Sequence, residues 1–164
     1  IITPETSSTF SSYLEEIRSA VEHREPTSAI LATVLETLSW GLKFDRAVLM
    51  FASGGKRILS GRMALGDLGS IDPKSIERRI DGSNSHTAEA KAFFNSELVF
   101  TGEPIFNNGW PFVCIPVGFG NRSIGIIYAD RIDKGSGELD VRERASLEVV
   151  AELLDRALSY SSTP

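Results

Sequence analysis

The sequence contains few of the residues that form covalent or metal-dependent sites. Of its 164 residues, one is cysteine and two are histidine. A single thiol excludes an intramolecular disulfide and a cysteine-based zinc site. His23 and His86 lie far apart and show no metal-binding spacing such as HExxH. We therefore expect neither a metal nor a cofactor.

Positive charge and long apolar runs are also scarce. The chain has 17 Lys and Arg against 22 Asp and Glu, a formal net charge of −5 at pH 7. Surfaces that bind nucleic acid or anionic membranes are usually basic, so we expect neither partner. No stretch approaches the roughly 18 consecutive apolar residues of a membrane span. With 41% hydrophobic residues, the composition is typical of one globular domain with a real core, and we expect it in the cytoplasm.

The chain starts at Ile1 and shows no basic segment followed by an apolar run. This start is unlike a signal peptide and indicates a piece of a longer polypeptide. We therefore expect an output domain elsewhere in that polypeptide.

The clearest structural signal is the segment PFVCIPVGFGNRSIGIIYAD. It predicts strands over residues 112–119 and 123–130, joined by a turn at Gly120-Asn121, where positive φ is tolerated. Apolar residues on both faces predict a central pair of strands. Pro116 cannot donate to a sheet ladder, so we expect a bulge or break at that residue.

Apolar periodicity and turn residues predict the remaining elements. Asp140 followed by Glu143 forms a capping box at the start of the final helix. The segment 75–80 fits a strand or a helical turn, and a strand is favoured. The expected elements are helices over 8–24, 27–42, 86–98 (capped by Ser85) and 140–160, and strands over 47–52 and 57–65. Residues 99–106 fit a loop or a loop with a short strand.

Both terminal helices carry a stripe of apolar residues. The first stripe is narrow and resembles a coiled-coil seam, so we interpret the two stripes as contacts with a partner. The stripes consist of Phe10, Leu14, Ile17 and Val21 in the first helix and Leu147, Val150, Ala151, Leu154 and Leu158 in the last.

The order of elements predicts an α+β fold. We expect a central antiparallel sheet of five or six strands, with the N- and C-terminal helices on one face and a loop-rich lid, residues 66–110, on the other. Residues 1–26 form an N-terminal helix and linker segment, and residues 27–164 form the main domain.

Five segments in this order resemble a GAF domain. They are GLKFDRAVLM (41–50), GRMALG (61–66), PFVCIPV (111–117), SIGIIYADR (123–131) and LDVRERASL (139–147). The pairing of FDRAVLM with GRMALG is similar to GAF modules beside HDOD domains in bacterial signalling proteins. The resemblance covers about residues 29–157 and implies a regulatory domain that binds a small ligand between sheet and lid and dimerises through its terminal helices.

Several chemistries of this family are disfavoured. The NKFDE-type motif of cyclic-nucleotide-binding members is absent. Sulfoxide reductases of this fold need several cysteines, and bilin-binding members need one in the loop region. Cys114 lies in a predicted strand, which favours a small buried hydrophobic residue over a nucleophile. Haem-binding members need an axial histidine, and the surroundings of His86 do not favour that role. No nucleophile, base and orienting group can be assembled, so we predict no catalytic residues and no enzymatic activity.

The candidate ligand site has five residues, each with a structural alternative. The indole of Trp110 is suited to stacking on a ligand ring, although tryptophan in this setting is more often core. Arg62 is suited to a carboxylate or phosphate, although an exposed strand arginine is the simpler interpretation. The full set is Arg62, His86, Trp110, Phe112 and Tyr128.

Charged residues at strand ends have a structural explanation. Asp45, Arg46, Asp130 and Arg131 are interpreted as salt bridges between strand ends.

Two functions remain open from the sequence. The first is a ligand-binding sensor that signals through dimeric terminal helices. The second is a dimerisation module without a ligand, which a pocket filled by its own aromatic side chains would favour. The sequence identifies neither the ligand nor the output domain.

Overall fold

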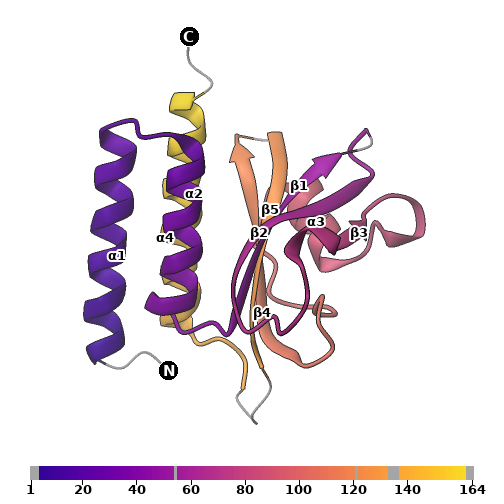
Figure 1. Cartoon of the computed structure of the whole chain (residues 1–164), viewed down its shortest axis with the longest axis horizontal. Helices are drawn as coiled ribbons and strands as arrows, with labels where there is room; N and C mark the ends of the chain where they lie inside the picture. The colour runs from indigo at the N-terminus through magenta and orange to yellow at the C-terminus, as the bar shows by residue number, and fades with distance from the viewer. Residues whose placement is uncertain (1–3, 54, 121, 133–136, 162–164) are drawn as a thin grey trace.

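The computed structural model describes residues 4–53, 55–120, 122–132 and 137–161. It has a five-stranded antiparallel sheet of strand order β3-β2-β1-β5-β4, with helices on both faces (Figure 1). The elements are α1 (Pro4–Glu22), α2 (Thr27–Glu36), a π-helical turn (Thr37–Gly41), β1 (Arg46–Ser53), β2 (Ile58–Gly66), β3 (Glu77–Arg79), α3 (Ala88–Asn95), β4 (Gly109–Phe119), β5 (Arg122–Ile132) and α4 (Val141–Ser161).

The layers follow the predicted α+β arrangement. Helices α2 and α4 pack on one face of the sheet, and α1 packs on α2 and α4 (Figure 1). The other face carries α3 and the long connections of the lid. Each face of the sheet therefore has its own hydrophobic core.

The last helix begins at the predicted capping box. The backbone N–H of Glu143 donates to Asp140 Oδ1 at 2.8 Å, and the backbone N–H of Asp140 donates to Glu143 Oε1 at 3.1 Å. These reciprocal bonds satisfy two N–H groups that an uncapped helix would leave without partners.

Two lid elements differ from the predictions. The segment 75–80 contains both alternatives, a 3₁₀ turn at Pro73–Ser75 and then β3. Helix α3 is shorter than predicted because its cap is Thr87, whose hydroxyl accepts the N–H of Ala90 at 3.3 Å. The helix ends at Ser96, whose φ of 50° is left-handed.

The hairpin of β4 and β5 is not a central pair. Strand β5 lies between β1 and β4, and β4 is the last strand of the described sheet. On its outer side, Val99 forms an isolated bridge with Cys114. Its two faces are apolar because α4 covers one and α3 the other. Pro116 stays in register with Ile126, and the register shift falls between Val117 and Gly118. An outer strand tolerates proline because its outward N–H needs no partner in the sheet.

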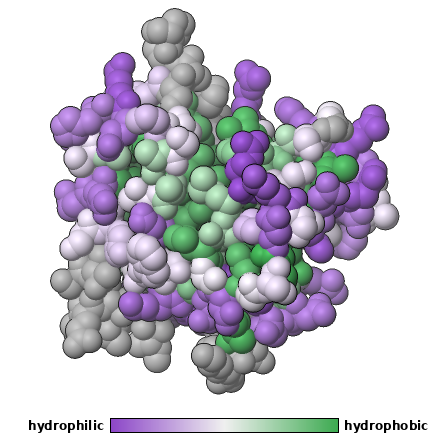
Figure 2. All heavy atoms as spheres, in the orientation of Figure 1, coloured by the Kyte–Doolittle hydropathy of each residue, from purple (hydrophilic) through white to green (hydrophobic). Residues whose placement is uncertain are grey.

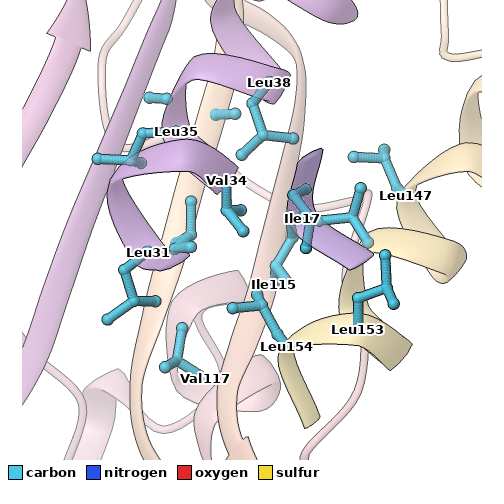
Figure 3. Packing of buried hydrophobic residues seen from close by; sticks show 14 of the residues in the cluster. Ile17, Leu31, Val34, Leu35, Leu38, Ile115, Val117, Leu147, Leu153 and Leu154 are labelled. Atoms are coloured by element: carbon cyan, nitrogen blue, oxygen red, sulfur yellow. The ribbon is translucent and has the colours of Figure 1, made fainter. Parts of the chain in front are cut away.

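The apolar stripes of the terminal helices are buried within one chain. Figure 3 shows Ile17 of α1 and Leu147, Leu153 and Leu154 of α4 converging with side chains of α2 and β4. The interpretation of these stripes as a dimer seam is therefore wrong for this conformation. They are apolar because α1 and α4 share the core of the same domain.

None of the helices in the described part of the chain is long and apolar enough to cross a bilayer. The domain boundary near residue 26 stays a prediction, although Phe10, Ile17 and Val21 contribute to the main core.

We expect Ile17→Ala to lower the free energy of unfolding by about 3 kcal/mol, because it opens a cavity at a fully buried position. Arg18→Ala is the matched control. Its side chain is exposed and pairs with Glu15 one turn away, so we expect a change within about 0.5 kcal/mol. Urea denaturation of both variants provides the measurement. Equal small effects would show that α1 is a linker and not part of the domain.

Candidate functional site

Aromatic side chains fill the lid-facing surface of β4 and β5. Phe112 and Tyr128 are fully buried and stack with ring centroids 5.9 Å apart. Trp110 packs edge-on against Phe112 at 5.7 Å, and Phe106 packs edge-on against Tyr128 at 5.8 Å. The space between sheet and lid is occupied here by the chain's own rings.

A buried ion pair lies beside these rings. Arg46 Nε donates to Asp130 Oδ1 at 2.8 Å and Arg46 Nη2 donates to Asp130 Oδ2 at 2.9 Å, a bidentate pair between β1 and β5. The hydroxyl of Tyr128 also donates to Asp130 Oδ2. Arg46 Nη2 reaches the side-chain oxygen of Asn108 at 2.9 Å, and its guanidinium lies 4.4 Å from the centre of the Phe106 ring. The network therefore joins two strands to the end of the lid.

Burial controls the protonation of this network. Desolvation raises the pKa of Tyr128, and the charge of Asp130 raises it further, so the phenol remains protonated and acts as the donor. Desolvation also raises the pKa of Asp130, while the hydrogen bonds from Arg46 and Tyr128 act in the opposite direction. The guanidinium and the phenol are thus the groups that keep a buried carboxylate in place.

Gly109 lets the lid approach this network. A Cβ atom at Gly109 would lie 1.9 Å from Asp130 Oδ2 and 2.7 Å from the Tyr128 hydroxyl oxygen. Any side chain at this position would displace the carboxylate or the chain that covers it.

The next residue of β5 makes the equivalent connection on the opposite face. Arg131 donates to the carbonyl of Leu42 at 2.8 Å and to the carboxylate of Glu143 in the capping box of α4. Its guanidinium lies 4.9 Å from the centre of the Phe44 ring. Successive strand residues point to opposite faces, so Asp130 contacts the lid network and Arg131 contacts the helix layer.

An open cavity of about 210 Å³ lies at the rim of the lid. Arg78 and Glu89 line it and form an ion pair at 2.7 Å, and His86 and Gly102 complete part of its wall. Glu89 is only 1% exposed, and its Oε2 accepts from Arg78 Nε at 2.7 Å. The cavity therefore offers a guanidinium, a buried carboxylate and an imidazole to a small polar molecule.

The structure separates the five predicted site residues into three places. Trp110, Phe112 and Tyr128 lie together, whereas His86 is at the rim cavity. Arg62 lies elsewhere, over the ring of Phe51 at 5.3 Å, and Phe51 packs against the helix-side core.

Sequence reasoning missed Arg78, Glu89 and Asn108. The salt-bridge interpretation of the strand-end charges is right for Arg46 and Asp130, whereas Arg131 pairs with Glu143. Glu89 is buried in α3 together with Ala88, Ala90 and Phe93. A glutamate among these apolar residues was the signal in the sequence for a buried carboxylate.

Neither the cysteine nor a cluster of metal ligands adds a reactive group to this region. Cys114 is fully buried, and desolvation raises the pKa of its thiol well above the usual value. Within the described ranges, no three His, Cys, Asp or Glu side chains come together as metal ligands.

Comparison of the sequence with family models and with curated proteins gives no match. Comparison of the structure gives a consistent answer. The GAF domain of a phosphoenolpyruvate-protein phosphotransferase from Coxiella burnetii superposes with a TM-score of 0.71 at 14% identity, covering 94% of this chain and 95% of that chain. Other similar structures are also GAF domains. The chain has the GAF fold.

Other proteins that superpose on this GAF fold have diverse functions. A free methionine-R-sulfoxide reductase from Neisseria meningitidis, in complex with its substrate, has a TM-score of 0.71 at 16% identity, covering 93% of this chain and 89% of that chain. A far-red-absorbing structure with bound biliverdin has a TM-score of 0.67 at 12% identity, covering 92% and 99%. At these identities the likeness establishes the fold alone.

We expect Arg46→Ala to cost about 3–5 kcal/mol of stability, because it leaves Asp130 buried without its cation. Tyr128→Phe is the milder comparison, with a cost of about 1 kcal/mol, since Asp130 keeps both bonds from Arg46. Urea denaturation at neutral pH measures both. If Tyr128→Phe were the costlier change, the ion pair would not be the main support of the network.

Proposed function

We propose that the chain is a regulatory sensor domain of a larger bacterial signalling protein. The observation that carries this proposal is the pair of adjacent residues on β5, Asp130 and Arg131, which connect the lid to the first turn of α4. The GAF fold supports it, because neighbours with this fold include sensory domains and a structure with a bound small molecule. In this proposal the domain is not an enzyme. It acts as a homodimer in the cytoplasm and passes its signal to an output domain.

The rim cavity is the proposed ligand site. Arg78 is suited to a carboxylate or phosphate of the ligand, and the carboxylate of Glu89 is suited to a hydrogen-bond donor. A site with both groups favours a small polar molecule over a flat hydrophobic one. His86, predicted as a ligand contact, lines this cavity, whereas Trp110, Phe112 and Tyr128 support the wall behind the lid.

The proposed signal starts with an ordered lid. A ligand held by Arg78 and Glu89 fixes β3 against α3, and the lid continues to Asn108, which is bonded to Arg46. Arg46 and Asp130 transfer a shift of this end of the lid to β5, and Arg131 transfers it to Glu143 at the start of α4. A change in the position of α4 is then available to the neighbouring output domain.

A second candidate is a dimerisation module that binds no ligand. One observation favours it, namely that buried rings such as Phe112 and Tyr128, with Phe93, fill the space under the lid. The two candidates differ in whether any molecule occupies the rim cavity.

Native mass spectrometry of the purified protein distinguishes them. We expect a retained small molecule, and we expect Glu89→Gln to lose it because the cavity loses its buried carboxylate, while Glu103 lines it at an exposed position. Arg79→Ala is the control, since Arg79 is an exposed neighbour that pairs with Asp81 instead. If the parent protein carries no extra mass, and no amino acid, dicarboxylate or nucleotide raises its melting temperature, the dimerisation module is the better description.

We also expect Asn108→Ala to loosen the first turn of α4, although that turn belongs to the opposite layer. Loss of the bond to Arg46 should raise amide hydrogen exchange at residues 106–109 and, about fivefold or more, at residues 141–144. Asn107→Ala is the matched control, because Asn107 is exposed and makes no described contact with the network. Faster exchange confined to residues 106–109 would show that β5 does not connect the two faces.

A further inference from the structure

A groove of about 170 Å³ lies between helix α2 and strand β2. Leu35 and Trp40 line the helix side of the groove, and Met63 and Leu65 line the strand side. Apart from Glu36, every side chain that lines it is apolar. Figure 2 shows apolar atoms gathered in the middle of this face, between the helices and the sheet, with hydrophilic atoms around them. Contiguous apolar surface of this kind marks interaction sites.

Trp40 is held in an exposed position by the backbone. It is 50% exposed and belongs to the π-helical turn that ends α2. Its neighbours Leu38 and Gly41 are buried, and Gly41 lies against Tyr13 of α1. The indole therefore projects from a rigid support. Tryptophan is one of the residue types enriched among those that dominate interface energies.

Opposite charges lie on the two sides of the groove. Glu36 is on the α2 side, and Arg62 precedes Met63 on the β2 side. Among the described residues, neither has an ion-pair partner, and the guanidinium of Arg62 contacts only the Phe51 ring. An apolar strip with one charge of each sign on its two sides is complementary to a copy of itself rotated by 180°.

We propose that this groove is the surface through which two copies of the chain form a symmetric dimer. Trp40 of each copy packs on the groove of the other, and Arg62 of each copy pairs with the partner's Glu36. This inference assigns an interface to the homodimer of the proposed function in place of the buried helical stripes. It requires no ligand, so failure of ligand binding leaves it standing.

Charge reversal with complementary mixing tests the pairing directly. Arg62→Glu alone places two carboxylates together at both ends of the dimer, and Glu36→Arg alone places two cations together. We expect each to weaken the dimer about tenfold or more in sedimentation velocity. A mixture of the two variants restores both Arg–Glu contacts in the heterodimer, and we expect dissociation close to that of the parent chain.

Trp40→Ser tests the apolar part of the same surface. We expect it to weaken the dimer about tenfold or more, whereas Phe94→Ser should have no effect. Phe94 is a close match because it is 49% exposed and lies on α3, on the other face of the sheet. All these side chains are exposed or half-buried, and circular dichroism verifies the fold of each variant.

Three results would overturn the proposal. The first is a parent chain that sediments as a monomer up to its solubility limit. The second is a dimer that none of the three groove variants weakens. The third is a mixture of Arg62→Glu and Glu36→Arg that associates no better than either variant alone.

Discussion

The buried ion pair of Arg46 and Asp130 is the interaction on which the lid side of the structure depends. A carboxylate without solvent is costly unless cations and donors surround it, and here one guanidinium and one phenol provide that environment. The partners come from β1, β5 and the end of the lid. Because Asp130 is fully buried, the chain around Gly109 must close over it without a side chain in between. The position of the lid is therefore fixed by electrostatics as well as by apolar packing.

The alternation of side chains along β5 extends this constraint to the other face of the sheet. Asp130 and Arg131 are neighbours in the chain, yet one is tied to the lid and the other to Glu143 at the start of α4. A displacement of β5 therefore changes contacts both in the lid and in the helix layer. The hydrophobic cores on the two faces are otherwise separate, so Asp130 and Arg131 near the end of β5 connect the two layers through polar contacts.

The chain shares its fold with proteins that hold a small molecule, but its own space under the lid is occupied by aromatic rings. The polar cavity lies at the rim instead, where Glu89 is buried beside Arg78. The apolar groove at Trp40 lies on the opposite face, between α2 and β2. Ligand and partner therefore have separate surfaces in the functions proposed for this domain, and the sheet lies between them.

The helices, the strands and the fold class follow largely from local patterns in the sequence. Local signals were sufficient for the capping box at Asp140, the positive φ of Gly120 after β4 and the antiparallel α+β arrangement, because each depends on neighbouring residues or on the period of apolar side chains; Asn121, the second residue of the predicted turn, lies outside the described residues. The surfaces that these elements cover became known only from the packing of the folded chain. The stripes of α1 and α4 proved to be internal, and β4 proved to be an outer strand covered on both faces, since burial depends on contacts between distant segments. Arg62 was misplaced for a similar reason. The bulge opposite Leu49 and Met50 inserts one extra residue into β2, so the alternation that would align Leu59 with Met63 is broken and the faces cannot be read from the sequence.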